Sequence, residues 1–174
     1  ESGSTDTFTV VLNAQPGSNV VLSVTSGDTG EATVSAGTLT FTSGNWNTAQ
    51  TVTVTGIDDN IIDGTITSTI TLSVVDAVTD DNFDAIADQT VSATTTDNDV
   101  AGFTIVQSSG STSVAETGST DTFTVVLNAQ PASNVVLART CGESGEAAEP
   151  SGSRTITTGN WNTAQTVTVP GIDD

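Results

Sequence analysis

The chain has 174 residues, with 21 acidic residues against two basic ones and no histidine, for a net charge of −19. This charge argues against nucleic acids and anionic membrane surfaces as partners, because both attract cationic proteins. The absence of lysine and histidine removes the usual amine nucleophile and proton shuttle, so we expect no enzymatic activity.

Alternating apolar and polar residues predict short strands along the whole chain. The predicted strands cover residues 8–12, 20–24, 39–41, 52–54, 66–74, 91–93 and 103–105. Turn-forming residues at 13–17 and a glycine-rich loop at 26–30 separate the first of them. No segment has a helical period, and no apolar run is long enough to span a membrane. The pattern predicts an all-β fold built from tandem antiparallel, Ig-like β-sandwiches.

An internal repeat sets the domain organisation. Residues 1–59 align without a gap with residues 116–174, and 43 of the 59 positions are identical. A repeat of this length is a whole domain rather than a small structural unit. We therefore expect one domain at 1–99, lacking a counterpart of 102–115 as its first strand, and a second at 100–174, lacking its last strands. A longer array of such domains is the expected parent protein.

Acidic residues concentrate in the turns that follow strands. The stretch GIDDNIIDG at 56–64 carries Asp58, Asp59 and Asp63, and its first half returns with Asp173 and Asp174. Adjacent ionised carboxylates repel, so a fold that gathers them must leave them in water or bind a cation. With oxygen ligands and no histidine, that cation is expected to be Ca²⁺.

Three motifs together resemble the Calx-beta domain, a β-sandwich of sodium–calcium exchangers and large extracellular bacterial proteins. They are AGTLTF at 36–41, IDDNIID at 57–63 and TDND at 96–99, and the resemblance covers the full repeat. It implies two packed sheets, with Ca²⁺ ions at one end of the sandwich. The ligand set implied by the resemblance is Glu1, Glu31, Asp58, Asp59, Asp63, Asp97 and Asp99, with Glu116, Glu146, Asp173 and Asp174 in the second copy.

Two departures from the family pattern remove negative charge. Asn98 stands where calcium-binding relatives tend to have a third acid, and Ile66 replaces a further acidic residue. They imply fewer ions or weaker binding, and we expect a dissociation constant of about 10⁻⁴ to 10⁻³ M, as in extracellular modules.

Three other features are less specific. A second acidic run at 76–88 lacks the spacing of an EF-hand loop; we expect Phe83 and Ile86 to hold it against the sandwich while its acids face water, and an additional ion stays open. Trp46 and Trp161 are expected to cap the core, with a carbohydrate platform as the alternative. The copies diverge between 138 and 158, where Arg154 replaces Leu39.

The features together favour a structural or adhesive repeat module of a long secreted or cell-surface protein, whose acidic ends bind calcium and stiffen the array. Its partners would be neighbouring repeats, further copies in a homopolymer, or cell-surface glycans. A carbohydrate- or protein-recognition β-sandwich is the alternative function.

Overall fold

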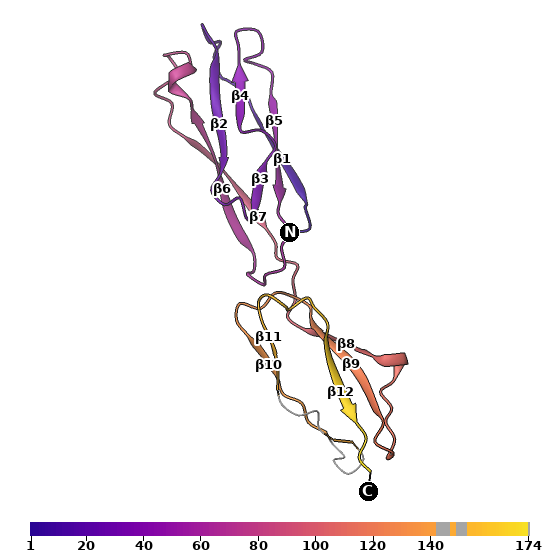
Figure 1. Cartoon of the computed structure of the whole chain (residues 1–174). Coiled ribbons are helices and arrows are strands. Elements are labelled where there is room, and N and C mark those ends of the chain that lie inside the picture. Colours follow the sequence, from indigo (N-terminus) through magenta and orange to yellow (C-terminus); the bar gives the residue numbers. More distant parts are fainter. Residues whose placement is uncertain (142–146, 149–152, 174) are drawn as a thin grey trace. The chain divides into compact units, whose positions relative to one another are not determined.

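The computed structural model describes residues 1–141, 147–148 and 153–173 (Figure 1). The chain forms two compact units. The first comprises Glu1–Asp59 and Asp63–Asn98, and the second comprises Asn60–Ile62 and Asp99–Asp174. Strands dominate both units, and the helices of the described part are two single turns of 3₁₀ helix, η1 (Asp76–Val78) and η2 (Ser108–Gly110). Neither has the length or apolar character needed to cross a membrane.

Two antiparallel sheets build the first unit. One has the strand order β1–β5–β3 and the other has the order β4–β2–β6–β7. The strands are β1 (Thr5–Val10), β2 (Val20–Ser26), β3 (Ala32–Val34), β4 (Thr38–Phe41), β5 (Gln50–Gly56), β6 (Ile66–Val74) and β7 (Gln89–Thr95). All neighbouring strands in these sheets run antiparallel. The predicted all-β fold class is confirmed.

The core of the first unit lies between its two sheets. In β4 the side chains alternate, so that Leu39 and Phe41 are buried while Thr38 and Thr40 are exposed. Phe41 packs with Val20 of β2, Val52 of β5 and Ile70 of β6, all four fully buried. The period-2 alternation of valine, isoleucine and leucine with threonine therefore supplies one buried face per strand, as the sequence predicts.

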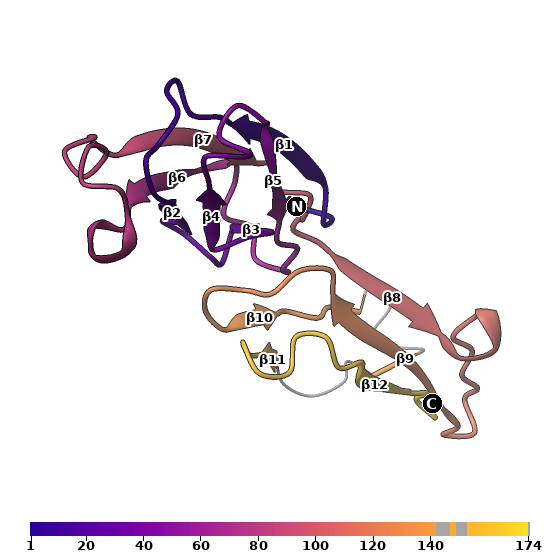
Figure 2. The ribbon, with the colours of Figure 1, turned by 90° about the horizontal axis from the view of Figure 1, so that it is seen from above.

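The repeated sequence forms the same strand pairs in the second unit. Its strands are β8 (Phe103–Gln107), β9 (Thr120–Leu127), β10 (Val135–Leu137), β11 (Arg154–Ile156) and β12 (Gln165–Pro170), with sheet orders β12–β9–β8 and β10–β11. Val125 of β9 lies opposite Gln165 as Val10 of β1 lies opposite Gln50. The two copies therefore share their registers, and Figure 2 shows β8 beside β9.

Two details differ from the sequence prediction. The short strand β3, which pairs with the end of β5, was not predicted, because three residues are too few to show an alternating pattern. Arg154, at the position of Leu39, is half-buried, and its guanidinium donates a 2.7 Å hydrogen bond to Oε1 of Gln165. That contact gives the charge a polar partner where the first unit has an apolar side chain.

The tryptophans lie where the repeat predicts equivalent surroundings. The backbone carbonyl of Trp46 accepts a hydrogen bond from the Leu12 amide at 3.1 Å, and that of Trp161 accepts one from Leu127 at the same distance. Both residues are half-buried. The two copies therefore hold the backbone of each tryptophan in the same way, and the capping role of the side chains stays a prediction.

Candidate metal centre

Strand pairing brings the ends of several strands together at one end of the first unit. Thr5 at the start of β1 lies opposite Thr55 near the end of β5, and Ala32 at the start of β3 lies opposite Gly56. In the other sheet, Ile66 at the start of β6 pairs with Thr95 at the end of β7. The predicted ligands lie just outside these strand ends, in residues 1, 31, 57–63 and 97–99. The topology therefore gathers acids that are up to 98 positions apart in the sequence.

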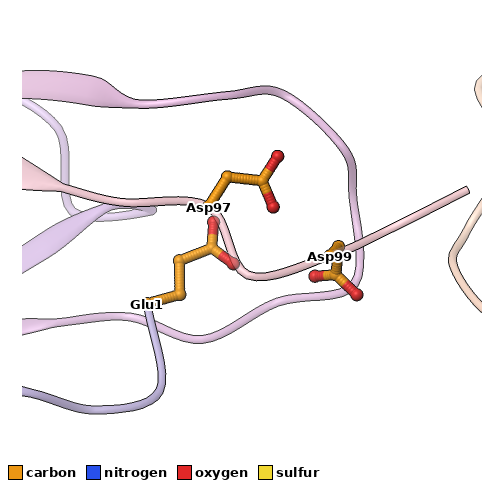
Figure 3. Close-up of side chains that lie close together, drawn as sticks. All are labelled: Glu1, Asp97 and Asp99. Carbon is orange, nitrogen blue, oxygen red and sulfur yellow. The ribbon is translucent and has the colours of Figure 1, made fainter.

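Glu1 belongs to two groups of acids whose carboxylate oxygens lie close together. One group is Glu1, Glu31 and Asp63; the other is Glu1, Asp97 and Asp99. In each group, one carboxylate oxygen per residue lies within 4.8 Å of the others. Figure 3 shows the side chain of Glu1 reaching toward Asp97. Glu1 is 5% exposed and Glu31 is 7% exposed, an unusual degree of burial for glutamate.

Backbone hydrogen bonds hold both glutamates in place. The backbone nitrogen of Glu1 donates to the carbonyl of Thr96, just after β7, and the carbonyl of Glu1 accepts from the Ser4 amide at 3.2 Å. The carbonyl of Glu31 accepts from the Ile57 amide at 2.8 Å and from the Thr95 hydroxyl at 3.0 Å. The two sheets therefore fix the positions of the carboxylates through the main chain.

The turn that carries Asp63 depends on a glycine. Gly64 has a φ of +80°, which lies in the left-handed region that side chains other than glycine rarely adopt. Its amide donates a 2.8 Å hydrogen bond to Oδ2 of Asp97. This contact links the β5–β6 connection to the segment that leaves β7, and it brings Asp63 and Asp97 to the same end of the unit.

Asp58 has a different environment from the two groups. Its Oδ1 accepts hydrogen bonds from the Ser2 amide at 2.8 Å and from the Asn98 side chain at 3.0 Å. The Ser2 hydrogen bond, followed by that of Asn98, lowers the pKa of Asp58. Asp58 thus links Ser2, which follows Glu1, to Asn98, which follows Asp97. The sequence did not predict this role of Asp58. Its role as a ligand stays a prediction, as does that of the half-buried Asp59.

The negative charges of the buried glutamates are destabilised by burial and by neighbouring carboxylates. Burial raises the pKa of Glu1, and the charges of Asp59 and Asp97 raise it further. Burial likewise raises the pKa of Glu31, with added repulsion from Asp63 and Asp28. Both arginines of the chain belong to the second unit, so no lysine or arginine of the first unit compensates this charge.

One oxygen at this site has no hydrogen-bonding partner. Oε2 of Glu1 is buried without a hydrogen bond. A buried carboxylate oxygen without a donor is costly unless a cation contacts it. Hard cations such as Ca²⁺ bind several carboxylate and carbonyl oxygens in flexible geometry. The donor set of the first group, three carboxylates from three separate segments, fits such an ion.

The second copy does not repeat these groups in the part that is described. Glu116, the counterpart of Glu1, is exposed, and so is Asp173. Glu146 and Asp174 lie outside the described residues, so the structure gives no position for those two predicted ligands. Among residues 99–141, 147–148 and 153–173, no three acids approach one another as Glu1, Glu31 and Asp63 do.

In the acidic run at 76–88, Asp76, Asp81 and Asp88 are exposed as expected, whereas Asp80 contradicts the expectation that the acids face water. Asp80 is 6% exposed. It accepts hydrogen bonds from the amides of Gly17 at 2.8 Å, Ser18 at 2.9 Å and Asn82 at 3.0 Å, and from the Asn82 side chain at 2.7 Å. These bonds, that of the Asn82 amide first, lower the pKa of Asp80 to about 2. Phe83 packs against the core as expected, whereas Ile86 is 47% exposed.

Comparisons with known proteins give only distant likenesses. No protein-family model and no curated protein sequence matches the chain. Among solved structures, the calcium binding domain CBD12 of CALX1.1 is similar at 14% identity and a TM-score of 0.37, over 99% of this chain and 70% of that one. CBD12 of CALX1.2 is similar at 13% identity and a TM-score of 0.35, with the same coverage.

A third solved structure is SSP-19, an MSP-domain protein like family member of Caenorhabditis elegans. It shows 15% identity and a TM-score of 0.35 over 54% of this chain and 85% of that one. With TM-scores below 0.5, these likenesses support no conclusion about the function of this chain. The fold class stands on the strands and sheets described above.

Proposed function

We propose that the chain is a structural and adhesive repeat module of a long secreted or cell-surface protein, and that its first unit binds Ca²⁺ through Glu1, Glu31 and Asp63, with Asp97 as a further ligand. The observation that carries the calcium proposal is Oε2 of Glu1, which is buried without a hydrogen bond next to other carboxylates. The resemblance of the sequence motifs to Calx-beta domains supports the same ion. Asp58, Asp59 and Asp99 stay predicted ligands.

Calcium at this site would act mechanically. Asp97 directly precedes Asn98, the last residue of the first unit. An ion shared by Glu1 and Asp97 would hold the segment leaving β7 against the start of the chain, and so restrict its motion. Stiffening of this kind suits a module that sets length and spacing in an array of repeats. A dissociation constant of about 10⁻⁴ to 10⁻³ M would suit an extracellular setting.

Thermal unfolding of the full chain in chelator and in excess Ca²⁺ tests the proposal. An ion that binds only the folded state stabilises it by RT ln(1 + [Ca²⁺]/Kd), which is about 1.4 kcal/mol at a tenfold excess over Kd. For a domain of this size, that gain raises the Tm by about 5–10 °C. We expect this rise for the unmodified chain, and a much smaller one when Mg²⁺ replaces Ca²⁺ at the same concentration.

The repeat provides a matched control. Glu1→Gln/Glu31→Gln should abolish the Ca²⁺-dependent rise in Tm, because it removes two of the four proposed charged ligands. Glu116→Gln changes the exposed counterpart of Glu1 and should leave the rise intact. Equal melting of the unmodified chain in chelator and in Ca²⁺ would refute the calcium site, while leaving the sandwich fold untouched.

A further inference from the structure

The acidic turn of the first unit contains an aspartate–glycine bond. Asp63 precedes Gly64 in the one Asp–Gly sequence of the chain, which has no Asn–Gly sequence. In such a pair the backbone nitrogen that follows the aspartate can attack the side-chain carboxyl and close a five-membered ring. Glycine permits this attack most readily, because it has no Cβ to restrict the backbone or to shield the nitrogen.

Asp63 and Gly64 lie where ring closure meets no steric obstacle. Both are exposed, and residues 62–65 lie outside the strands, between β5 and β6. Gly64 has a φ of +80°, and a Cβ built on it would have no atom within 4 Å other than those of its chain neighbours. The turn therefore has the open space that a change in the path of the backbone needs.

A hydrogen bond restrains the nitrogen that would attack. The Gly64 amide donates to Oδ2 of Asp97 at 2.8 Å, so its N–H group is directed at Asp97 rather than at the side chain of Asp63. Segments with few buried contacts open locally at a small cost in free energy. Because Asp63, Gly64 and Thr65 are all exposed, this hydrogen bond can break without disturbing the core.

The surroundings of Asp63 favour the loss of its charge when no cation is present. Carboxylate oxygens of Glu1 and Glu31 lie within 4.8 Å of one of its own. The charge of Asp63 also contributes to the raised pKa of Glu31, after burial, which shows that these groups repel each other. A succinimide ring at Asp63 is neutral, so its formation relieves this repulsion. A bound cation relieves the same repulsion and holds the carboxylate in place.

We propose that Asp63–Gly64 is a site of spontaneous isomerisation to isoaspartate, and that calcium bound to the first unit protects it. The protection, though not the reaction, rests on the proposed function. The Gly64 nitrogen bonds to Cγ of Asp63, and its proton leaves as water with the hydroxyl of the protonated carboxyl. Water then opens the ring at either carbonyl, which restores aspartate or gives isoaspartate. The reaction needs no oxidant, reductant or other co-reactant.

Isoaspartate would destroy the site in which it forms. The main chain then runs through Cβ and Cγ of residue 63, so the turn gains one methylene group. The remaining carboxylate is attached directly to Cα, one methylene closer to the backbone than in aspartate. It therefore loses the position that brings it to Glu1 and Glu31. A module that loses calcium would in time lose the ability to bind it again, whereas a loaded module is preserved.

Peptide mapping of aged protein tests the proposal. The full chain is incubated at physiological temperature and neutral pH, in chelator and in Ca²⁺ at ten times the Kd. Isoaspartate is located with a protease that cleaves before aspartate but not before isoaspartate, and by enzymatic methylation of the new carboxylate. We expect isoaspartate to accumulate at residue 63 in chelator. If only the calcium-free chain reacts, a tenfold excess of Ca²⁺ over Kd should slow the reaction about tenfold.

The chain supplies its own reference positions. Asp59, Asp81 and Asp97 each precede an asparagine, whose side chain shields the nitrogen that would attack. Each should form several times less isoaspartate than Asp63 in the same sample. Asp63→Glu keeps the carboxylate but requires a six-membered ring, and should stop the reaction at that position.

The Tm of each sample, measured before ageing, separates the two proposals. The absence of isoaspartate at residue 63 in chelator, or equal amounts at the reference positions, would overturn the reactive bond. Equal rates in chelator and in Ca²⁺, in a chain whose Tm rises with Ca²⁺, would overturn the protection and leave the calcium site standing. Ca²⁺ that changes neither the Tm nor the rate would refute the proposed calcium site and the protection together, while isomerisation in chelator would still support the reactive bond.

Discussion

At the scale of single residues, the same glutamate has two environments in one chain. Glu1 and Glu116 occupy equivalent places in the repeat, yet Glu1 is 5% exposed and Glu116 is exposed. The difference comes from neighbours: the turn at Asp63 and the segment at Asp97 bring further carboxylates to Glu1. Whether a glutamate can be a ligand therefore depends on the strand ends that surround it and not on its identity alone.

The pKa shifts predict an unusual dependence of stability on pH when Ca²⁺ is absent. The pKa values of Glu1 and Glu31 are raised above the ordinary 4.5, so the folded first unit holds these protons more tightly than the unfolded chain. Stability should therefore increase as the pH falls from neutral through the raised values, and the gain should be complete below 4.5.

The lowered pKa of Asp80 makes stability depend on pH in the opposite direction from Glu1 and Glu31. Its pKa is about 2 in the folded unit against an ordinary 3.8, so its contribution is present above 3.8 and is lost as the pH falls through about 2. Denaturant titrations in chelator across this range should show maximal stability near pH 4. In Glu1→Gln/Glu31→Gln most of the gain in stability as the pH falls toward 4.5 should be lost, leaving the share of Asp84, whose pKa is raised by burial, while the acid loss remains. A flat profile in the unmodified chain between pH 7 and 4.5 would contradict the burial of these two acids.

At the scale of strands and turns, the sequence predicted what alternation can encode. β4 and β6 were predicted because their apolar residues recur at every second position and face the core. β3 was missed because it has three residues and is stabilised by pairing with β5, a contact distant in sequence. Asp80 was also beyond prediction, since its donors at Gly17 and Ser18 are more than 60 positions away.

The grouping of Glu1 with Glu31 and Asp63 has a similar limit. The acidic turn at 57–63 is visible in the sequence, but the positions of Glu1 and Glu31 came from the family resemblance rather than from any spacing. The registers of β1, β3 and β5 explain why they meet. The hydrogen bonds of Asp58 could not be predicted from the sequence, because its partners Ser2 and Asn98 stand at the beginning and the end of the sequence of the first unit.

The core strand β4 permits a stability test of the sandwich. Phe41→Ala removes a fully buried side chain that contacts strands of both sheets, and should lower the free energy of unfolding of the first unit by about 3–5 kcal/mol. Thr40→Ala, one residue away on the exposed face, should change it by less than about 0.5 kcal/mol. Denaturant unfolding of the full chain measures both. Similar losses from the two substitutions would contradict the assignment of faces in β4.

At the scale of the whole molecule, each unit has buried residues of its own. The core cluster of the first unit is drawn from β2, β4, β5 and β6, while Ile156 and Val167 are buried in the second. We expect calorimetry to show two unfolding transitions. Phe41→Ala should lower the midpoint of one, Val167→Ala should lower the other, and Ca²⁺ should raise only the midpoint that Phe41→Ala lowers. A single transition shifted by both substitutions would show that the units unfold together.

The shared registers of the two copies also bear on how the chain finds its native pairing. Because β1 and β9 have one sequence, and β5 and β12 differ at a single position, β1 can form the same hydrogen bonds with β12 as with β5. Exchange of strands between neighbouring repeats is a characteristic misfolding route of such chains. The discrimination between correct and exchanged partners then falls to β4 and β11, where Leu39 and Phe41 are replaced by Arg154 and Ile156. Divergence between the β2–β4 pair and the β10–β11 pair would thus disfavour pairing between strands of different repeats, which the identical strands β1 and β9 would otherwise permit.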